Sequence, residues 1–109
     1  MADQMPYFAE GALAEYEAFI KAIGDDAVHL LAELIRLHNH GNSSDIPAAD
    51  KNRTNVRDLN CRCVEEWAVF YAAQSTRNQC QITVAHVGRY ETNSFSALES
   101  EAEKRQRNL

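Results

Sequence analysis

Residues 67–73 read Trp-Ala-Val-Phe-Tyr-Ala-Ala, an uninterrupted apolar run in a chain of 109 residues. Together with the apolar positions that precede it, this run predicts a long helix over about 54–76. The second half of that helix is apolar on all sides, so it must also be covered on all sides. The rest of so short a chain offers few segments for this task. The run therefore predicts cover by a further segment or by a second subunit.

The beginning of the chain has the pattern of two amphipathic helices. Apolar residues recur at helical spacing on both sides of Gly24, and glycine suits the left-handed residue that ends a helix. Asp25 is a suitable N-cap for the second helix. Because the linker is very short, residues 8–40 are predicted to form an αα-hairpin.

The last third of the chain has weaker signals. Alternating apolar and polar residues predict a short strand or hairpin at about 79–93, with a continuation of the long helix as the alternative. A capping box at Ser96 opens a polar C-terminal helix, and residues 95–109 are expected to fray or to depend on a partner. The predicted fold class is mostly α, in a single domain over residues 1–109.

The net charge of −5 is concentrated in the first third of the chain. Residues 1–40 contain seven acids and two bases, a net of −5, whereas residues 41–109 contain nine of each. An acidic surface repels phosphates, so direct binding to nucleic acid is not expected. A protein partner with a basic surface is predicted instead. The predicted partner-binding residues are Glu10, Glu15, Glu17, Asp25, Asp26 and Glu33.

Large aromatic side chains on the predicted long helix favour a protein interface. The predicted oligomer interface consists of Trp67, Val69, Phe70 and Tyr71, and we expect a homodimer. Small size and acidity fit an inhibitor or adaptor of a macromolecular partner, such as a nucleic-acid-handling enzyme, of the kind that mobile elements encode. Because no catalytic signature stands out, an enzyme is the less favoured class.

A small-molecule binder is the alternative function. Lys51, Arg53 and Arg57 lie near the predicted start of the long helix, where free amide groups favour phosphate or carboxylate. A nucleotide or other anion is the ligand expected there, and ion pairing with the acidic hairpin is the purely structural explanation. A third hypothesis is a small enzyme that uses cysteine or histidine. Three cysteines and four histidines are available, but no local motif selects one of them.

Two short motifs contain zinc-ligand residue types, His38-x-His40 and Cys61-x-Cys63. Residues two apart on a helix point in different directions, so neither a metal nor another cofactor is predicted. No apolar run is long enough for a membrane helix. The N-terminal sequence lacks the features of a signal peptide, which together with three cysteines predicts a cytoplasmic protein with free thiols.

Overall fold

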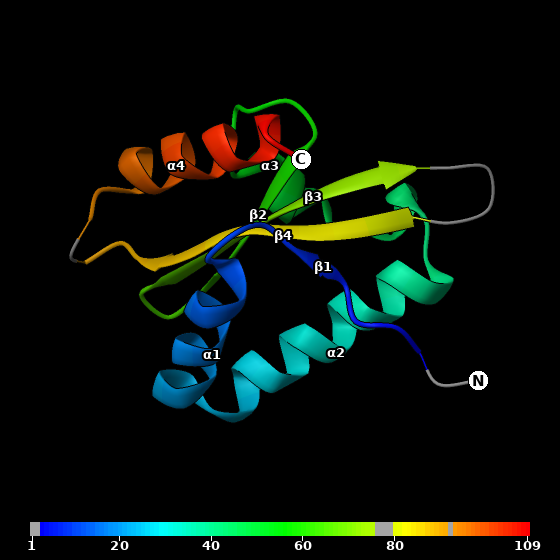
Figure 1. Ribbon diagram of the computed structural model, residues 1–109, viewed down its shortest axis with the longest axis horizontal. Coiled ribbons are helices and arrows are strands. Elements are labelled where there is room, and N and C mark those ends of the chain that lie inside the picture. The colour runs from blue at the N-terminus through cyan, green and yellow to red at the C-terminus, as the bar shows by residue number, and fades with distance from the viewer. Residues whose placement is uncertain (1–2, 76–79, 92) are drawn as a thin grey trace.

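The computed structural model describes residues 3–75, 80–91 and 93–109, and these form an α+β fold (Figure 1). The chain passes through β1 (Tyr7–Phe8), α1 (Ala12–Ile23), α2 (Asp25–His40), a 3₁₀ turn (Ser43–Asp45), α3 (Ala48–Asn52), β2 (Leu59–Val64), β3 (Trp67–Ser75), β4 (Cys80–Arg89) and α4 (Phe95–Arg107). The described strands make one mixed sheet in the order β1-β4-β3-β2. The prediction of a mostly α, helical protein is therefore wrong.

The apolar run at residues 67–73 lies in a central strand of the sheet and not in a helix. Alternate side chains of a strand point to opposite faces of the sheet. Trp67, Val69 and Tyr71 accordingly join the core under α1 and α2, whereas Ala68 and Phe70 join the core under α4. A strand covered on both faces is apolar at every position, as a fully buried helix would be. The long helix predicted over 54–76 is replaced by the antiparallel pair β2 and β3.

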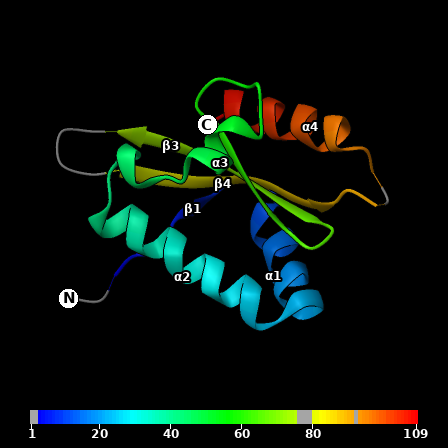
Figure 2. The ribbon, with the colours of Figure 1, turned by 180° about the vertical axis from the view of Figure 1, so that it is seen from behind.

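The sheet lies between two helical layers (Figure 1). The helices α1 and α2 form an open V on one face, and α4 crosses the other face. Seen from behind, α3 lies beside β2 (Figure 2). Leu98 and Ala102 anchor the otherwise polar α4 in the smaller core. None of the helices in the described ranges is long and apolar enough to cross a membrane.

The helices α1 and α2 lie within the region predicted to be a helical hairpin, and not every apolar side chain on them is buried. On α2, the side chains of Ala27, Leu30 and Leu34 are buried in the core, whereas Val28 is 47% exposed. On α1, Leu13 is likewise 51% exposed. In both helices small alanines pack closely on the sheet. The buried face therefore includes alanines and leaves out some larger apolar side chains.

The strand β4 is one continuous strand paired along its length with β3, and no turn interrupts it at residues 86–88. It contains a bulge, because Phe70 pairs with His86 and Tyr71 with Val84, which leaves Ala85 as an extra residue. The bulge changes the alternation of the strand. Val84 belongs to the core under α1 and α2, whereas Ala85 belongs to the core under α4.

The outer edge of β4 is closed by β1 and by side chains. The Ala9 amide donates to the Val84 carbonyl at 2.9 Å, next to the two-residue parallel pairing of β1. On one side of this pairing, the Ile82 amide donates to Nδ1 of His38 at 3.0 Å. On the other side, the Val87 amide donates to a carboxylate oxygen of Glu15 at 3.1 Å. Covered edges of this kind protect a sheet from pairing with other strands.

Candidate functional site

The bulge in β4 places His86 on the same side of the sheet as α4. In a strand of regular alternation, with no bulge, residue 86 would lie on the same face as Ile82 and Val84. Bulges of this kind re-aim side chains and are common beside functional sites. His86 is 8% exposed, and the position opposite it on β3 is Phe70.

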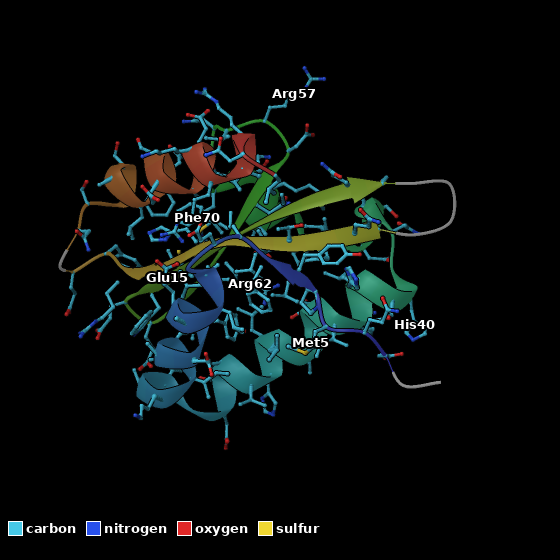
Figure 3. All side chains as sticks on the ribbon, viewed as in Figure 1. Met5, Glu15, His40, Arg57, Arg62 and Phe70 are labelled. Carbon is cyan, nitrogen blue, oxygen red and sulfur yellow. The ribbon has the colours of Figure 1, made fainter. Side chains whose placement is uncertain are left out.

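Glu15, labelled on α1 in Figure 3, reaches His86 from the other face of the sheet, and its carboxylate also meets the edge of β4 at the Val87 amide. Its Oε1 atom lies 3.0 Å from Nδ1 of His86 and accepts from the Val87 amide at 3.1 Å. Arg105 on α4 donates from its two terminal nitrogens to the two oxygens of Glu15, at 2.8 and 3.0 Å. One carboxylate thus connects α1, β4 and α4.

These contacts hold Glu15 in its ionised form. Burial alone would raise its pKa, but the hydrogen bonds from His86, Arg105 and the Val87 amide outweigh burial and lower the pKa to about 2. An ionised carboxylate can only accept hydrogen bonds. Nδ1 of His86 must therefore carry the proton that is shared with Glu15. In a neutral imidazole, this leaves Nε2 without a proton and with a free lone pair.

Nε2 of His86 has no hydrogen-bond partner within the described residues, and the side chain borders a cleft of about 370 Å³. The cleft lies between the end of β4 and the first half of α4. Its lining residues are Glu15, His86, Val87, Gly88, Asn93, Ala97, Leu98 and Glu101. A buried histidine that lines a cleft, with one nitrogen held by a carboxylate and the other without a protein partner, has the arrangement of a general base.

Arg105 fixes the position of Glu15. Its Nε atom donates to Glu101 at 2.8 Å, and a terminal nitrogen also donates to the Ala85 carbonyl at 3.3 Å. The guanidinium lies close to Gly11, where an added Cβ would be 3.7 Å from its nitrogens. Gly11 has a φ of +86°, which glycine adopts without strain. The backbone at the start of α1 therefore leaves room for the guanidinium of Arg105.

The six acidic residues predicted to bind a partner divide into two groups. Glu15 and Glu33 are committed to internal ion pairs, with Arg105 at 2.8 Å and with Arg62 at 3.1 Å. The remaining four side chains are exposed and form no ion pair in the part of the chain that the structure describes: Glu10, Glu17, Asp25 and Asp26. The predicted acidic surface is thus smaller than the sequence suggested.

The bases predicted to bind an anion lie on or after the short α3. No helix begins at residue 54, so the amide groups that motivated this prediction are not arranged as expected. Arg53 instead donates to the Cys61 carbonyl at 3.3 Å and lies 3.7 Å from Asp50. Arg57 is 96% exposed at its side chain and projects away from the molecule (Figure 3). Lys51 is exposed at the end of α3.

The residues predicted to form an oligomer interface are inside the single chain. Trp67 is 8% exposed, and the other three, Val69, Phe70 and Tyr71, are 0% exposed. The reason for expecting a second subunit over this segment does not hold, because α1, α2 and α4 cover both of its faces. A homo-oligomer therefore has no support from these four residues.

The histidine and cysteine motifs do not come together. Cys61 and Cys63 lie on β2, where residues two apart share a face, and not on a helix as assumed. Burial raises the pKa of the Cys61 thiol, which makes it a poor nucleophile. His38 is buried against β4, whereas His40 contacts Asp3 at the surface. Within residues 3–75, 80–91 and 93–109, no three His, Cys, Asp or Glu side chains form a metal site.

A second buried ionic cluster has a structural role. Asp50 of α3 is 1% exposed and accepts from Arg62 Nε at 2.9 and 3.0 Å and from the Tyr71 hydroxyl at 2.6 Å. Arg62 also binds both oxygens of Glu33 on α2, at 3.1 Å each. Burial, followed by the bond to Asp50, raises the pKa of Tyr71. Both oxygens of Asp50 are occupied by protein donors, so the cluster joins α2, α3 and the sheet.

The sequence contained only partial signals for the cleft. Glu15 was selected for its charge, but its partner Arg105 is separated from it by 90 residues and lies in a helix read as polar. His86 lies in the segment predicted to be a short strand or hairpin, and the alternation of apolar and polar residues there ends at Val84. The break in alternation at residues 85 and 86 was the one local sign of a bulge. A comparison with protein-family models, curated proteins and solved structures found no match to this chain.

Proposed function

We propose that this protein is a small enzyme in which His86 performs general acid–base catalysis. The observation that carries the proposal is that Glu15 binds Nδ1 of His86 at 3.0 Å, while Nε2 has no partner in the described residues and the side chain lines the cleft. The alternative class of an enzyme that uses histidine is thus favoured over catalysis by Cys61, whose thiol is buried.

The contacts define a role for each residue in a proton transfer. Nε2 of His86 accepts a proton from a substrate group or from a bound water, and the ring becomes an imidazolium. The ionised Glu15 stabilises that positive charge and keeps the proton of Nδ1 in place, as the carboxylate does in a catalytic triad. The imidazolium then returns the proton from Nε2 to the leaving group. Arg105 is a positioning residue, because it contacts Glu15 and not the cleft side of the ring.

Hydrolysis of the activated ester p-nitrophenyl acetate tests this proposal. The wild-type protein should hydrolyse the ester faster than the His86→Gln variant by on the order of 100-fold, the lower end of what a positioned acid–base group contributes. His29→Gln is the matched control, because His29 is an exposed histidine of α2 with no hydrogen bond in the described residues. Equal rates for His86→Gln and wild type, with both proteins folded, would disprove the proposal.

A second candidate function is binding to a macromolecular partner with a basic surface, as an inhibitor or adaptor. The supporting observation is that four acidic side chains on or beside α1 and α2 are exposed and have no ion pair in the described ranges: Glu10, Glu17, Asp25 and Asp26. Clustered charge of one sign accelerates association with a partner of the opposite sign. The acids Glu15 and Glu101 near the cleft, in contrast, both pair with Arg105 inside the protein.

Binding to the cationic protein protamine tests this second candidate. The double variant Glu17→Lys, Asp25→Lys should bind more weakly than the control Glu65→Lys, Glu91→Lys, which changes the net charge equally at other exposed sites. Binding of the Glu17→Lys, Asp25→Lys variant should also depend less steeply on salt than binding of the control. If the two double variants bind alike, the effect comes from net charge and not from this surface.

A further inference from the structure

We infer that the His86 cleft takes a substrate with a cationic group, a guanidinium or an ammonium, and that Glu101 is the residue that binds this group. The inference rests on the proposed acid–base function and specifies its substrate class. It depends on which charges around the cleft are already satisfied by the protein and which are open.

The arginine that contacts the carboxylates of the cleft is fully used inside the protein. All three guanidinium nitrogens of Arg105 donate to carboxylate oxygens of Glu15 or Glu101. No lysine or arginine is among the residues that line the cleft. In this ion-paired group Glu15 and Glu101 contribute two negative charges and Arg105 one positive charge, and Lys104, which also acts on Glu101, lies outside the lining of the cleft. A phosphate or carboxylate group would be repelled from such a cleft.

Glu101 has a carboxylate oxygen that no protein group in the described residues binds. Its Oε2 atom accepts from Arg105, whereas Oε1 has no partner in the described residues, and the side chain is 41% exposed. The hydrogen bond from Arg105 lowers the pKa of Glu101, so the carboxylate is ionised at neutral pH. A guanidinium or ammonium donates several hydrogen bonds and accepts none, which matches a carboxylate oxygen that has no donor.

The rest of the cleft fits the stem of a cationic side chain. Leu98, Ala97 and Gly88 give it an apolar wall, and Asn93 lies at its border. The absence of a side chain at Gly88 is required, because an added Cβ would lie 2.6 Å from Leu98 and 3.5 Å from Nε2 of His86. A side chain of arginine or lysine type combines an apolar stem with a charged end.

A neighbouring hollow of about 340 Å³ also borders Glu101, but unlike the His86 cleft it is lined by a lysine and an arginine. Glu10 and Glu101 face Lys104 and Arg105 there. The preference for a cation is therefore a property of the His86 cleft. Glu101, which borders both spaces, is the side chain whose change should alter ligand binding without removing His86.

Protection of His86 from diethyl pyrocarbonate tests the inference. This reagent modifies an imidazole nitrogen that has a free lone pair, and mass spectrometry measures the modification at each histidine. The probe is Nα-acetyl-arginine amide, which has no free amine or carboxylate. Nα-acetyl-citrulline amide is its neutral counterpart of nearly the same shape, and inorganic phosphate is the anionic comparison. The arginine compound should slow the modification of His86 in a saturable way, whereas the citrulline compound and phosphate should not.

The Glu101→Gln variant separates this inference from the proposed function. Measured against the ligand-free rate of the same variant, protection should need at least about tenfold more of the arginine compound than in wild type, the loss expected for one charge-assisted hydrogen bond. Glu17→Gln is the control, because Glu17 is exposed on α1 and does not border the cleft.

The possible failures are distinguishable. If His86 does not react in the free wild-type protein while His29 does, Nε2 is not open and the acid–base proposal fails. If His86 reacts but the arginine compound gives no protection, or no more than the citrulline compound or phosphate, the cationic substrate class is wrong and the acid–base proposal stands. Unchanged protection in Glu101→Gln would remove Glu101 as the binding residue.

Discussion

Glu15 joins three elements of the fold and also contacts the imidazole of the proposed base. Its two oxygens accept hydrogen bonds from Arg105, the Val87 amide and Nδ1 of His86, so the same contacts close the edge of β4 and orient the imidazole. The residue is an acid in an acidic region of the sequence, which gave it the appearance of a surface charge. Its actual environment depends on residues far away in the chain.

The pKa of Glu15 predicts a stability that is lost in acid. Its folded-state pKa of about 2 lies below its ordinary value of 4.5, so the ionised form is favoured by folding. The contribution is complete above pH 4.5 and disappears as the pH falls from 4.5 to 2. At neutral pH it amounts to up to about 3 kcal/mol.

The Glu15→Gln variant should therefore be less stable than wild type at pH 7 by about 1–3 kcal/mol, because a charged acceptor is lost beside Arg105. The difference from wild type should shrink as the pH falls from 4.5 to 2. Urea denaturation at several pH values measures both effects. Glu17→Gln on the same helix should change stability by less than about 0.5 kcal/mol. A difference that does not vary with pH would refute the assignment.

His38 gives a second prediction, in a higher pH range. Burial lowers its pKa, and Nδ1 accepts a hydrogen bond from the Ile82 amide, which a protonated ring cannot do. Folding favours the neutral form, so stability should be complete above the ordinary pKa of 6.5 and should decline as the pH falls below it. His38→Asn keeps an acceptor but does not titrate, and should lose this part of the decline. His29→Asn should keep it, and identical curves for both variants would contradict the prediction.

Among the elements, α3 depends most clearly on a single residue. It has only five residues and is too short to be stable alone. Asp50 connects it to the sheet through Arg62 and Tyr71. Asp50→Ala would leave both donors without this acceptor inside the protein and should cost about 3–5 kcal/mol. Lys51→Ala on the same helix should cost less than about 0.5 kcal/mol. Thermal unfolding measures the contrast, and similar losses would show that the cluster is not stabilising.

The sequence predicted helices well where one face is buried and one is exposed. Residues 12–23 and 25–40 have that pattern and are helical. It failed for residues 67–73, because a strand buried on both faces and a helix buried on all sides have the same uniform apolar composition. It also failed at Ala85 and His86, where the bulge shifts the strand alternation by one residue. The cleft depends on this bulge, so the sequence could not have located it.

At the scale of the whole molecule, polar contacts connect the layers on both faces of the sheet. Arg105 of α4 binds Glu15 of α1 on one side of the molecule, and Arg62 of β2 binds Glu33 of α2 on another. These links, together with the two cores, predict a single cooperative unfolding transition. Trp67 is the sole tryptophan, and its ring centroid lies 5.4 Å from that of Phe19. Its fluorescence therefore reports on the core under α1. Its fluorescence and the far-ultraviolet circular dichroism should give coincident urea transitions, whereas separate midpoints would indicate independent layers.

The central claim is that Nδ1 of His86 carries a proton bound to Glu15 and that Nε2 is open to the cleft. Long-range ¹H–¹⁵N correlation spectra of the histidine rings measure the proton position directly, and His86→Gln assigns the signals. Above neutral pH, the account predicts a protonated Nδ1 and an unprotonated Nε2 for His86, and the reverse tautomer for His38, whose Nδ1 accepts from Ile82. A protonated Nε2 and bare Nδ1 in His86 would contradict the account.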